Sequence, residues 1–154
     1  MSDVVIANPV INSPFREPDR HFVFGDTGIT NETAPGRRSS SYFQPIAQAR
    51  SKKGPQLPLD TQWTKDRIEE NRTVNEIRAR VGQWRQGGYA GVTPMTRRLL
   101  EYWTNDARDK KLFFCQIEAL ETAIYLTEVA SKYGDAWIAN RLREANDTAN
   151  PGMP

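Results

Sequence analysis

Hydrophobic residues recur at helical spacing through much of the chain beyond residue 60. The first such stretch has one apolar stripe at three- and four-residue steps, formed by Val74, Ile77, Val81 and Trp84. This periodicity predicts a helix that begins with Asp60 or Thr61 as its cap and runs to about Gln86. Ile68 lies off the stripe, so the first two turns are expected to face a different neighbour. The Gly87-Gly88 pair ends the helix, because glycine accepts the left-handed conformation that closes a helix.

Two further helices are predicted after this one. Thr93-Pro94 opens the second, since threonine is a favoured cap and proline suits the first helical position. Its inner face is expected to carry Met95, Leu99, Tyr102 and Trp103. Asn105 or Asp106 is the expected cap of the third and longest helix, which Gly134 ends. Apolar residues surround most of this third helix, which is typical of a central helix contacted from several sides: Leu112, Phe113, Phe114, Ile117, Leu120, Ile124, Tyr125, Leu126, Val129 and Tyr133.

A fourth helix completes the predicted helical domain. Asp135 is its expected cap, and the chain leaves the helix before Asn150-Pro151-Gly152. Its apolar residues at helical spacing are Ile138, Leu142 and Ala145. Four helices with short connections form a small bundle, which we expect to span residues 61–150.

The first sixty residues have a different backbone chemistry. They contain seven of the ten prolines, which cannot donate ladder hydrogen bonds and which favour extended neighbours. Two stretches look capable of forming strands, His21–Phe24 and Ser41–Phe43, and turn residues Gly25–Gly28 follow the first. We therefore expect residues 1–60 to form an extended arm that could hold one β-hairpin. The predicted fold class is mainly α.

Composition narrows the functional classes. The net charge of +2 gives no global field for nucleic-acid binding, and no run approaches the roughly 18 apolar residues of a membrane span. A single cysteine, Cys115, suits a reducing cytoplasm and is expected to be a small buried hydrophobe. The lone histidine, His21, is expected to serve packing or the surface. Two carboxylate pairs, Glu69-Glu70 and Glu118/Glu121, are expected to be solvated or ion-paired.

One segment, Lys111–Ala123, has a chemical rationale beyond packing. Its sequence is Lys-Leu-Phe-Phe-Cys-Gln-Ile-Glu-Ala-Leu-Glu-Thr-Ala. The amide of Gln116 can donate to and accept from the N7/N6 edge of adenine at once, and Phe113 or Phe114 can stack on the purine. The three residues are therefore candidate adenine contacts. The same spacing is also typical of an ordinary core helix.

Several segments resemble, in order, the start of a restriction-endonuclease-like family. That family is related to the Res subunits of type III restriction–modification systems, which belong to the superfamily 2 helicases. The resembling segments are residues 8–45, Trp63–Asn71, Trp84–Tyr89, Gly91–Pro94 and Leu112–Ala119. The resemblance implies that Gln116 corresponds to the glutamine of the Q motif, which recognises the adenine of ATP in related helicases.

The resemblance also implies what these 154 residues lack. In that family the region like Glu144–Gly152 is followed by a strand and the phosphate-binding loop, whereas this sequence contains no Gly-Lys-Ser/Thr. ATP and magnesium are the cofactors of the intact family, and none is expected for this chain alone. We expect an amino-terminal fragment of a helicase–nuclease, inactive by itself. Its implied partners are a separately encoded motor and nuclease half, DNA in the intact enzyme, and a methyltransferase subunit.

Two other functions compete with this one. A stand-alone DNA-binding regulator would use the second helix with its Arg97-Arg98 pair, although the Gly87–Thr93 connection is longer than a usual helix-turn-helix turn. An interaction module would wrap its proline-rich arm around a partner protein. Under that hypothesis Arg37-Arg38 and the cluster at Arg50–Lys53 are ordinary solvated charge.

Overall fold

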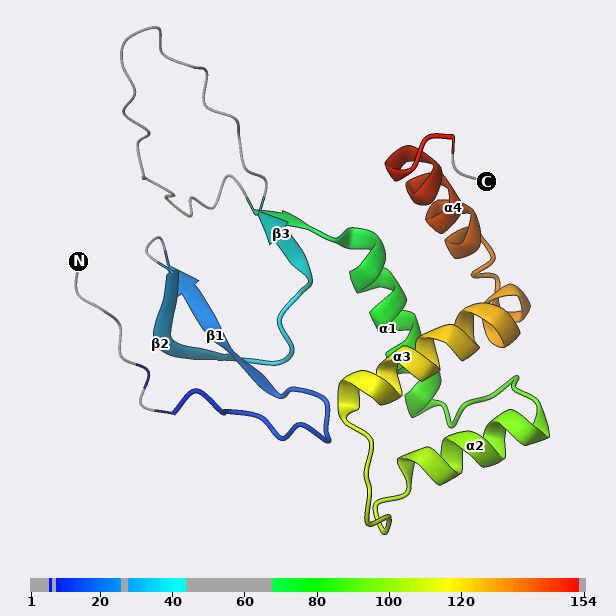
Figure 1. Cartoon of the computed structure of the whole chain (residues 1–154), viewed down its shortest axis with the longest axis horizontal. Coiled ribbons are helices and arrows are strands. Elements are labelled where there is room, and N and C mark those ends of the chain that lie inside the picture. The colour runs from blue at the N-terminus through cyan, green and yellow to red at the C-terminus, as the bar shows by residue number, and fades with distance from the viewer. Residues whose placement is uncertain (1–5, 7, 26–27, 44–67, 153–154) are drawn as a thin grey trace, which may run out of the picture. The chain divides into compact units, whose positions relative to one another are not determined.

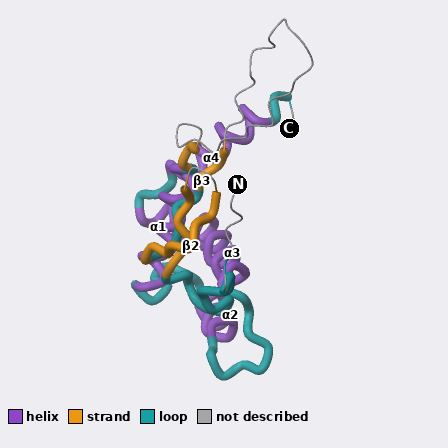
Figure 2. Tube along the Cα trace, turned by 90° about the vertical axis from the view of Figure 1, so that its left-hand side faces the viewer, coloured by secondary structure: helices purple, strands orange, loops and turns teal. Residues whose placement is uncertain are grey.

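Helix dominates the chain from Arg72 onward, and strands in the described part occur only before that residue (Figures 1 and 2). The computed structural model describes residues 6, 8–25, 28–43 and 68–152. About half of these residues are helical, which confirms the mainly α class. They divide into two compact units. The first contains residues up to Ser13 and then Pro18–Asn71, and the second contains Pro14–Glu17 with the residues from Arg72 onward. The predicted boundary at residues 60 and 61 lies outside the described residues.

The first unit contains the predicted hairpin. Strand β1 (Arg20–Gly25) pairs antiparallel with β2 (Gly28–Pro35), and a bulge interrupts their register between Phe22 and Phe24. The prediction of a strand at His21–Phe24 is confirmed, whereas the long second strand was not predicted. Strand β2 has little buried surface and contains polar residues such as Asn31 and Glu32. It therefore lacks the alternation of apolar and polar residues by which a strand is predicted.

A second two-stranded sheet corrects the predicted start of the first helix. Strand β3 (Ser41–Phe43) was predicted, but its partner β4 (Ile68–Glu70) falls where a helix was expected. The Tyr42 hydroxyl donates to Glu69 Oε2 at 2.7 Å, and the Asn71 N–H donates to the Ser40 carbonyl at 2.9 Å. The strand pairing and the Asn71 bond satisfy the backbone in an extended form, and the Tyr42 bond joins side chains across the two strands. Residues 61–67 of the predicted helix lie outside the described part.

Helix α1 (Arg72–Gln86) begins directly after Asn71 and supplies one wall of the helical core. Ile77, Val81 and Trp84 are buried as their spacing predicts, whereas Val74, on the first turn, is exposed. The helix packs against α3 (Phe114–Ile124) and α4 (Trp137–Ala149), as Figure 1 shows. The buried apolar residues of the unit are Ile77, Val81, Trp84, Leu100, Tyr125, Val129, Ala130 and Ile138.

Helix α2 (Pro94–Thr104) has the predicted cap but not the predicted inner face. The Thr93 hydroxyl accepts the N–H of Thr96, and Pro94 occupies the first turn. The buried residues are Thr96 and Leu100 with part of Trp103, whereas the apolar residues expected inside are exposed: Met95, Leu99 and Tyr102. Hydrogen bonding turns the helix this way, since Thr96 Oγ1 donates to Glu128 Oε1 at 2.6 Å. The spacing of apolar residues alone does not predict a hydrogen bond between two polar side chains.

Helix α3 starts later than predicted, and helices of two other types follow it directly. Neither Asn105 nor Asp106 caps it; the Asn105 side chain instead accepts the N–H of Ala107 in a turn, and the helix begins at Phe114. It continues as a π-helical segment (Tyr125–Val129) and a 3-10 turn (Ala130–Tyr133). Gly134 ends the run in the left-handed conformation at φ 81°, as predicted. Much of the apolar surface of α3 is only half buried, so within this unit the helix is not surrounded.

Helix α4 ends after Ala149, as predicted, but Asp135 does not cap it with its side chain. The Asp135 carboxylate instead accepts the hydroxyl of Tyr125 and the indole N–H of Trp137. Ile138 is fully buried, whereas Leu142 is exposed. No helix in the described residues is long and apolar enough to cross a membrane.

Replacing Thr93 by alanine should destabilise the fold by about 1 kcal/mol, because the first turn of α2 loses its side-chain cap. Thr93→Ser keeps the hydroxyl and should stay close to the original stability. Urea denaturation followed by circular dichroism measures both. Equal stability of the Ala and Ser variants would contradict a capping role.

Glu128 should make stability depend on pH. Hydrogen bonds from the Thr96 hydroxyl and the Thr93 N–H lower the pKa of Glu128 below its ordinary 4.5. A lowered folded-state pKa gives stabilisation that is fully present above pH 4.5 and is lost as the pH falls through the folded value. The stability advantage over Glu128→Gln should therefore shrink on acidification, measured by urea denaturation between neutral pH and pH 3. A constant difference in stability between the two proteins across that pH range would argue against a lowered pKa of Glu128.

Candidate functional site

The segment that sequence analysis singled out forms the start of α3. Phe113 is the extended residue before the helix, and Gln116 is the third helical residue. The Gln116 side chain folds back over this start, so that its Oε1 accepts the Phe113 N–H at 2.9 Å. The Gln116 N–H in turn donates to the Phe113 carbonyl at 2.9 Å. This reciprocal pair is a helix cap, and it fixes the orientation of an otherwise exposed amide.

The two phenylalanines have different surroundings. Phe113 is exposed on one side and packs against Phe15 with ring centroids 5.4 Å apart. Phe114 is half buried, and the Arg85 guanidinium lies 5.1 Å from its ring centroid. The Phe114 N–H donates to the Pro14 carbonyl at 2.8 Å. Residues Pro14–Glu17 thus hold the beginning of α3 from outside the helix.

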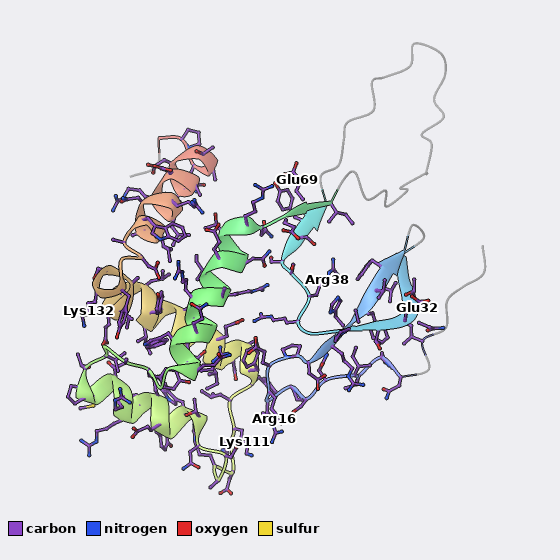
Figure 3. All side chains as sticks on the ribbon, turned by 180° about the vertical axis from the view of Figure 1, so that it is seen from behind. Arg16, Glu32, Arg38, Glu69, Lys111 and Lys132 are labelled. Carbon is purple, nitrogen blue, oxygen red and sulfur yellow. The ribbon has the colours of Figure 1, made fainter. Side chains whose placement is uncertain are left out.

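A pocket of about 230 Å³ opens beside Phe114. Arg16 and Lys111, which are both labelled in Figure 3, line this pocket. Its wall contains three basic side chains, four aromatic rings and several polar groups: Phe15, Arg16, Arg85, Tyr89, Trp103, Thr104, Asn105, Asp106, Lys111, Leu112, Phe114, Ile117 and Glu121. Of the three predicted adenine contacts, only Phe114 lines this pocket. Phe113 and Gln116 lie beside it at the helix start.

A buried ion pair forms the inner wall of the pocket. The Glu121 carboxylate is fully buried and accepts three bonds from Arg85, the shortest at 2.6 Å to Nη2, and one from the Tyr89 hydroxyl at 2.6 Å. Arg85 also donates to Glu17 at 3.0 Å. Burial raises the pKa of Tyr89, and the bond to Glu121 raises it further, so the hydroxyl stays protonated and donates. The ion-pair prediction is confirmed for Glu121.

Sequence reasoning missed Arg85 and Tyr89. The available signal was a carboxylate at position 121 in the middle of an apolar helix, because such a group must find a partner when it is buried. Sequence reasoning also misjudged Cys115, which is exposed rather than buried. Cys115 lies on the first turn of α3, where the flanking Phe114 takes the inward position.

The side chains around the pocket beside Phe114 are of kinds that can bind a ligand. In the described ranges no group of three or more His, Cys, Asp or Glu residues could hold a metal ion. Arg16 can attract a phosphate or carboxylate, while Lys111 already pairs with Asp106 Oδ1 at 3.3 Å. The rings of Phe114 and Trp103 can contact a planar group. The region therefore has the composition of a site for an anionic ligand with an aromatic part.

Comparison with known proteins gives no independent identification. No family model matches the chain, and no match was found among curated proteins or solved structures.

Removing the buried charge of Glu121 should destabilise the chain strongly. Glu121→Gln leaves the Arg85 guanidinium without its buried partner, which should cost about 3 kcal/mol. Glu17→Gln removes the exposed partner of the same arginine and should cost less than about 1 kcal/mol. Urea denaturation compares the two variants. Similar losses in both would mean that the buried bond is not the dominant one.

Proposed function

We propose that the chain is the amino-terminal, adenine-contacting part of a helicase–nuclease related to type III restriction Res subunits. The resemblance over residues 8–45 and four later segments supports the family. The helix start at Gln116 supports the role within it. In the intact enzyme this part would contact ATP, while DNA and a methyltransferase subunit would bind elsewhere.

The exposed, fixed amide of Gln116 is the observation on which this proposal rests. Its Oε1 has two lone pairs, and the Phe113 N–H uses one of them. The second lone pair and the two Nε2 hydrogens can still pair with the N6 and N7 positions of adenine. Because the cap already holds the side chain, binding loses less conformational entropy than it would for a free glutamine.

Neighbouring groups support a nucleotide rather than a bare base. The outer face of Phe113 is exposed, and Phe114 lines a pocket that also contains Arg16 and Lys111. An aromatic ring can stack on the purine, while basic side chains attract the phosphates. The start of α3 adds a partial positive charge.

Catalysis requires parts beyond these residues. Hydrolysis of ATP needs a phosphate-loop lysine and carboxylates that hold magnesium, and the sequence has no Gly-Lys-Ser/Thr segment. An adenine contact with stacking must also offset the loss of translational freedom, so affinity for ATP alone is weak. We propose that the half-buried apolar surface of α3 and of the π-helical segment after it, around Leu120 and Leu126, packs against the motor half.

A protein-interaction module is the second candidate. The exposed stripe of Met95, Leu99 and Tyr102 on α2 favours it, because contiguous exposed apolar residues often mark a binding surface. DNA reading by α2 has less support. The Arg97 guanidinium already donates to the Gly88 and Tyr89 carbonyls at 3.0 Å each, so it is held against the helix connection.

The proposed adenine contact is testable in the polypeptide extended through its downstream coding sequence, which should contain a phosphate loop. Gln116→Glu keeps an oxygen for the Phe113 N–H but cannot donate to adenine, so it should raise the KM for ATP by about 5- to 100-fold with little change in thermal stability. Gln116→Ala should lose both binding and the helix cap.

The control is GTP, whose purine edge has a different donor pattern, and Gln116→Glu should narrow the preference for ATP over GTP. An unchanged KM in both variants would refute the adenine contact. A downstream sequence without a phosphate loop would refute the family.

A further inference from the structure

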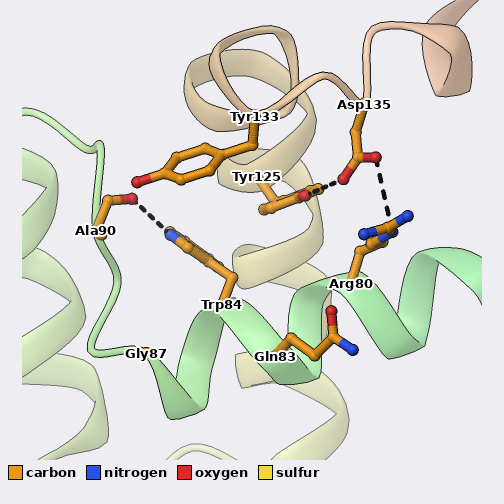
Figure 4. Close-up of a pocket in the computed structure, with 8 residues that line it drawn as sticks. All are labelled: Arg80, Gln83, Trp84, Gly87, Ala90, Tyr125, Tyr133 and Asp135. Atoms are coloured by element: carbon orange, nitrogen blue, oxygen red, sulfur yellow. Dashed lines mark hydrogen bonds and ion pairs between the residues drawn. The ribbon is translucent and has the colours of Figure 1, made fainter.

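A second pocket in the helical unit has three aromatic side chains among the eight residues that line it. It has a volume of about 280 Å³ and lies between α1 and the segment that follows α3 (Figure 4). Trp84 and Tyr125 form its floor, since they are only 7% and 4% exposed, while Tyr133 at 57% forms the rim. The remaining lining residues are Arg80, Gln83, Gly87, Ala90 and Asp135. None of the three candidate adenine contacts belongs to it.

The floor of the pocket is rigid. The Trp84 indole N–H donates to the Ala90 carbonyl at 2.8 Å, and the Trp84 and Tyr125 rings are 5.6 Å apart at an angle of 57°. The Tyr125 hydroxyl donates to the buried Asp135 carboxylate. Burial and that bond raise the pKa of Tyr125 to about 12, so it remains a neutral donor at physiological pH. The rings are therefore held in place before any ligand arrives.

The charges at one end of the pocket decide the ligand class. Arg80 Nε lies 3.6 Å from Asp135 Oδ1, and Figure 4 shows this pair beside the Tyr125 hydroxyl. The Arg80 cation opposes a positively charged ligand, although three aromatic rings would otherwise suit one. The Asp135 anion equally opposes an acidic group. A neutral planar ring system with polar edges fits both the stacking surface and the paired charges.

We propose that this pocket binds a single nucleobase. Its volume is near the lower end of the range for small-molecule sites, which suits one ring system rather than an extended ligand. The base would stack on the ring of Tyr133, which is 57% exposed, while the nearly buried Trp84 and Tyr125 close the pocket beneath it. The exposed Gln83 amide and the outer N–H groups of Arg80 are available to its polar edge. The base could belong to a free nucleotide or to a single strand of DNA.

Titration of the full chain with deoxynucleoside monophosphates and short oligodeoxynucleotides, followed by tryptophan fluorescence, tests this proposal. We expect saturable binding of at least one of these probes. An abasic strand of equal length should bind more weakly than the base-containing strand. Similar affinity for mononucleotide and strand identifies a free nucleotide as the ligand, and a clear gain with the strand identifies single-stranded DNA.

Tyr133→Ala should weaken binding by about five-fold or more, whereas Tyr133→Phe keeps the ring and should bind as the original chain does. Tyr102→Ala removes an exposed tyrosine that does not line the pocket and should leave affinity unchanged. If Tyr133→Ala unfolds, Gln83→Ala should still weaken binding. The proposal fails if no probe binds, if the abasic strand binds equally well, if neither variant weakens binding, or if tetramethylammonium binds in place of the bases.

Discussion

The buried carboxylate of Glu121 is the constraint on which the helical unit depends. A charge without contact to water is tolerated only if donors surround it, and here those donors come from α1 and from the connection that follows α1. Satisfying Glu121 therefore fixes the crossing of α1 and α3. Because Arg85 also binds Glu17, the same pair brings the Pro14–Glu17 segment to the beginning of α3.

The two pockets are both lined by residues of α1, but they differ in the charged side chains that line them. The pocket beside Phe114 is lined by three basic side chains and two carboxylates, and Arg85 and Lys111 are each paired with one of those carboxylates. The pocket over Trp84 has one cation and one anion, already paired with each other. Trp84 and Arg85 are neighbours in α1, so a single helix turn supplies a wall to each pocket. A change in the pitch or position of α1 would alter both.

Local sequence patterns predicted where helices begin and end better than they predicted which residues each helix contacts. Thr93 marked the start of α2 and Gly134 marked the end of the helical run after α3, because each acts on the backbone of residues next to it in sequence. The inner face of α2 was not predictable from apolar spacing, since the contact between Thr96 and Glu128 joins residues far apart in the chain. Strand β4 was missed for the same reason. Its three residues form a strand only because β3 provides the partner.

The membership of Pro14–Glu17 in the helical unit has a practical consequence for domain dissection. Four residues from the beginning of the chain complete a unit whose other residues start at Arg72. They provide the Pro14 carbonyl for α3, the Phe15 ring for Phe113 and the Glu17 carboxylate for Arg85. A helical domain expressed from Arg72 alone would expose these surfaces, so cutting the chain at a single point cannot isolate this unit intact.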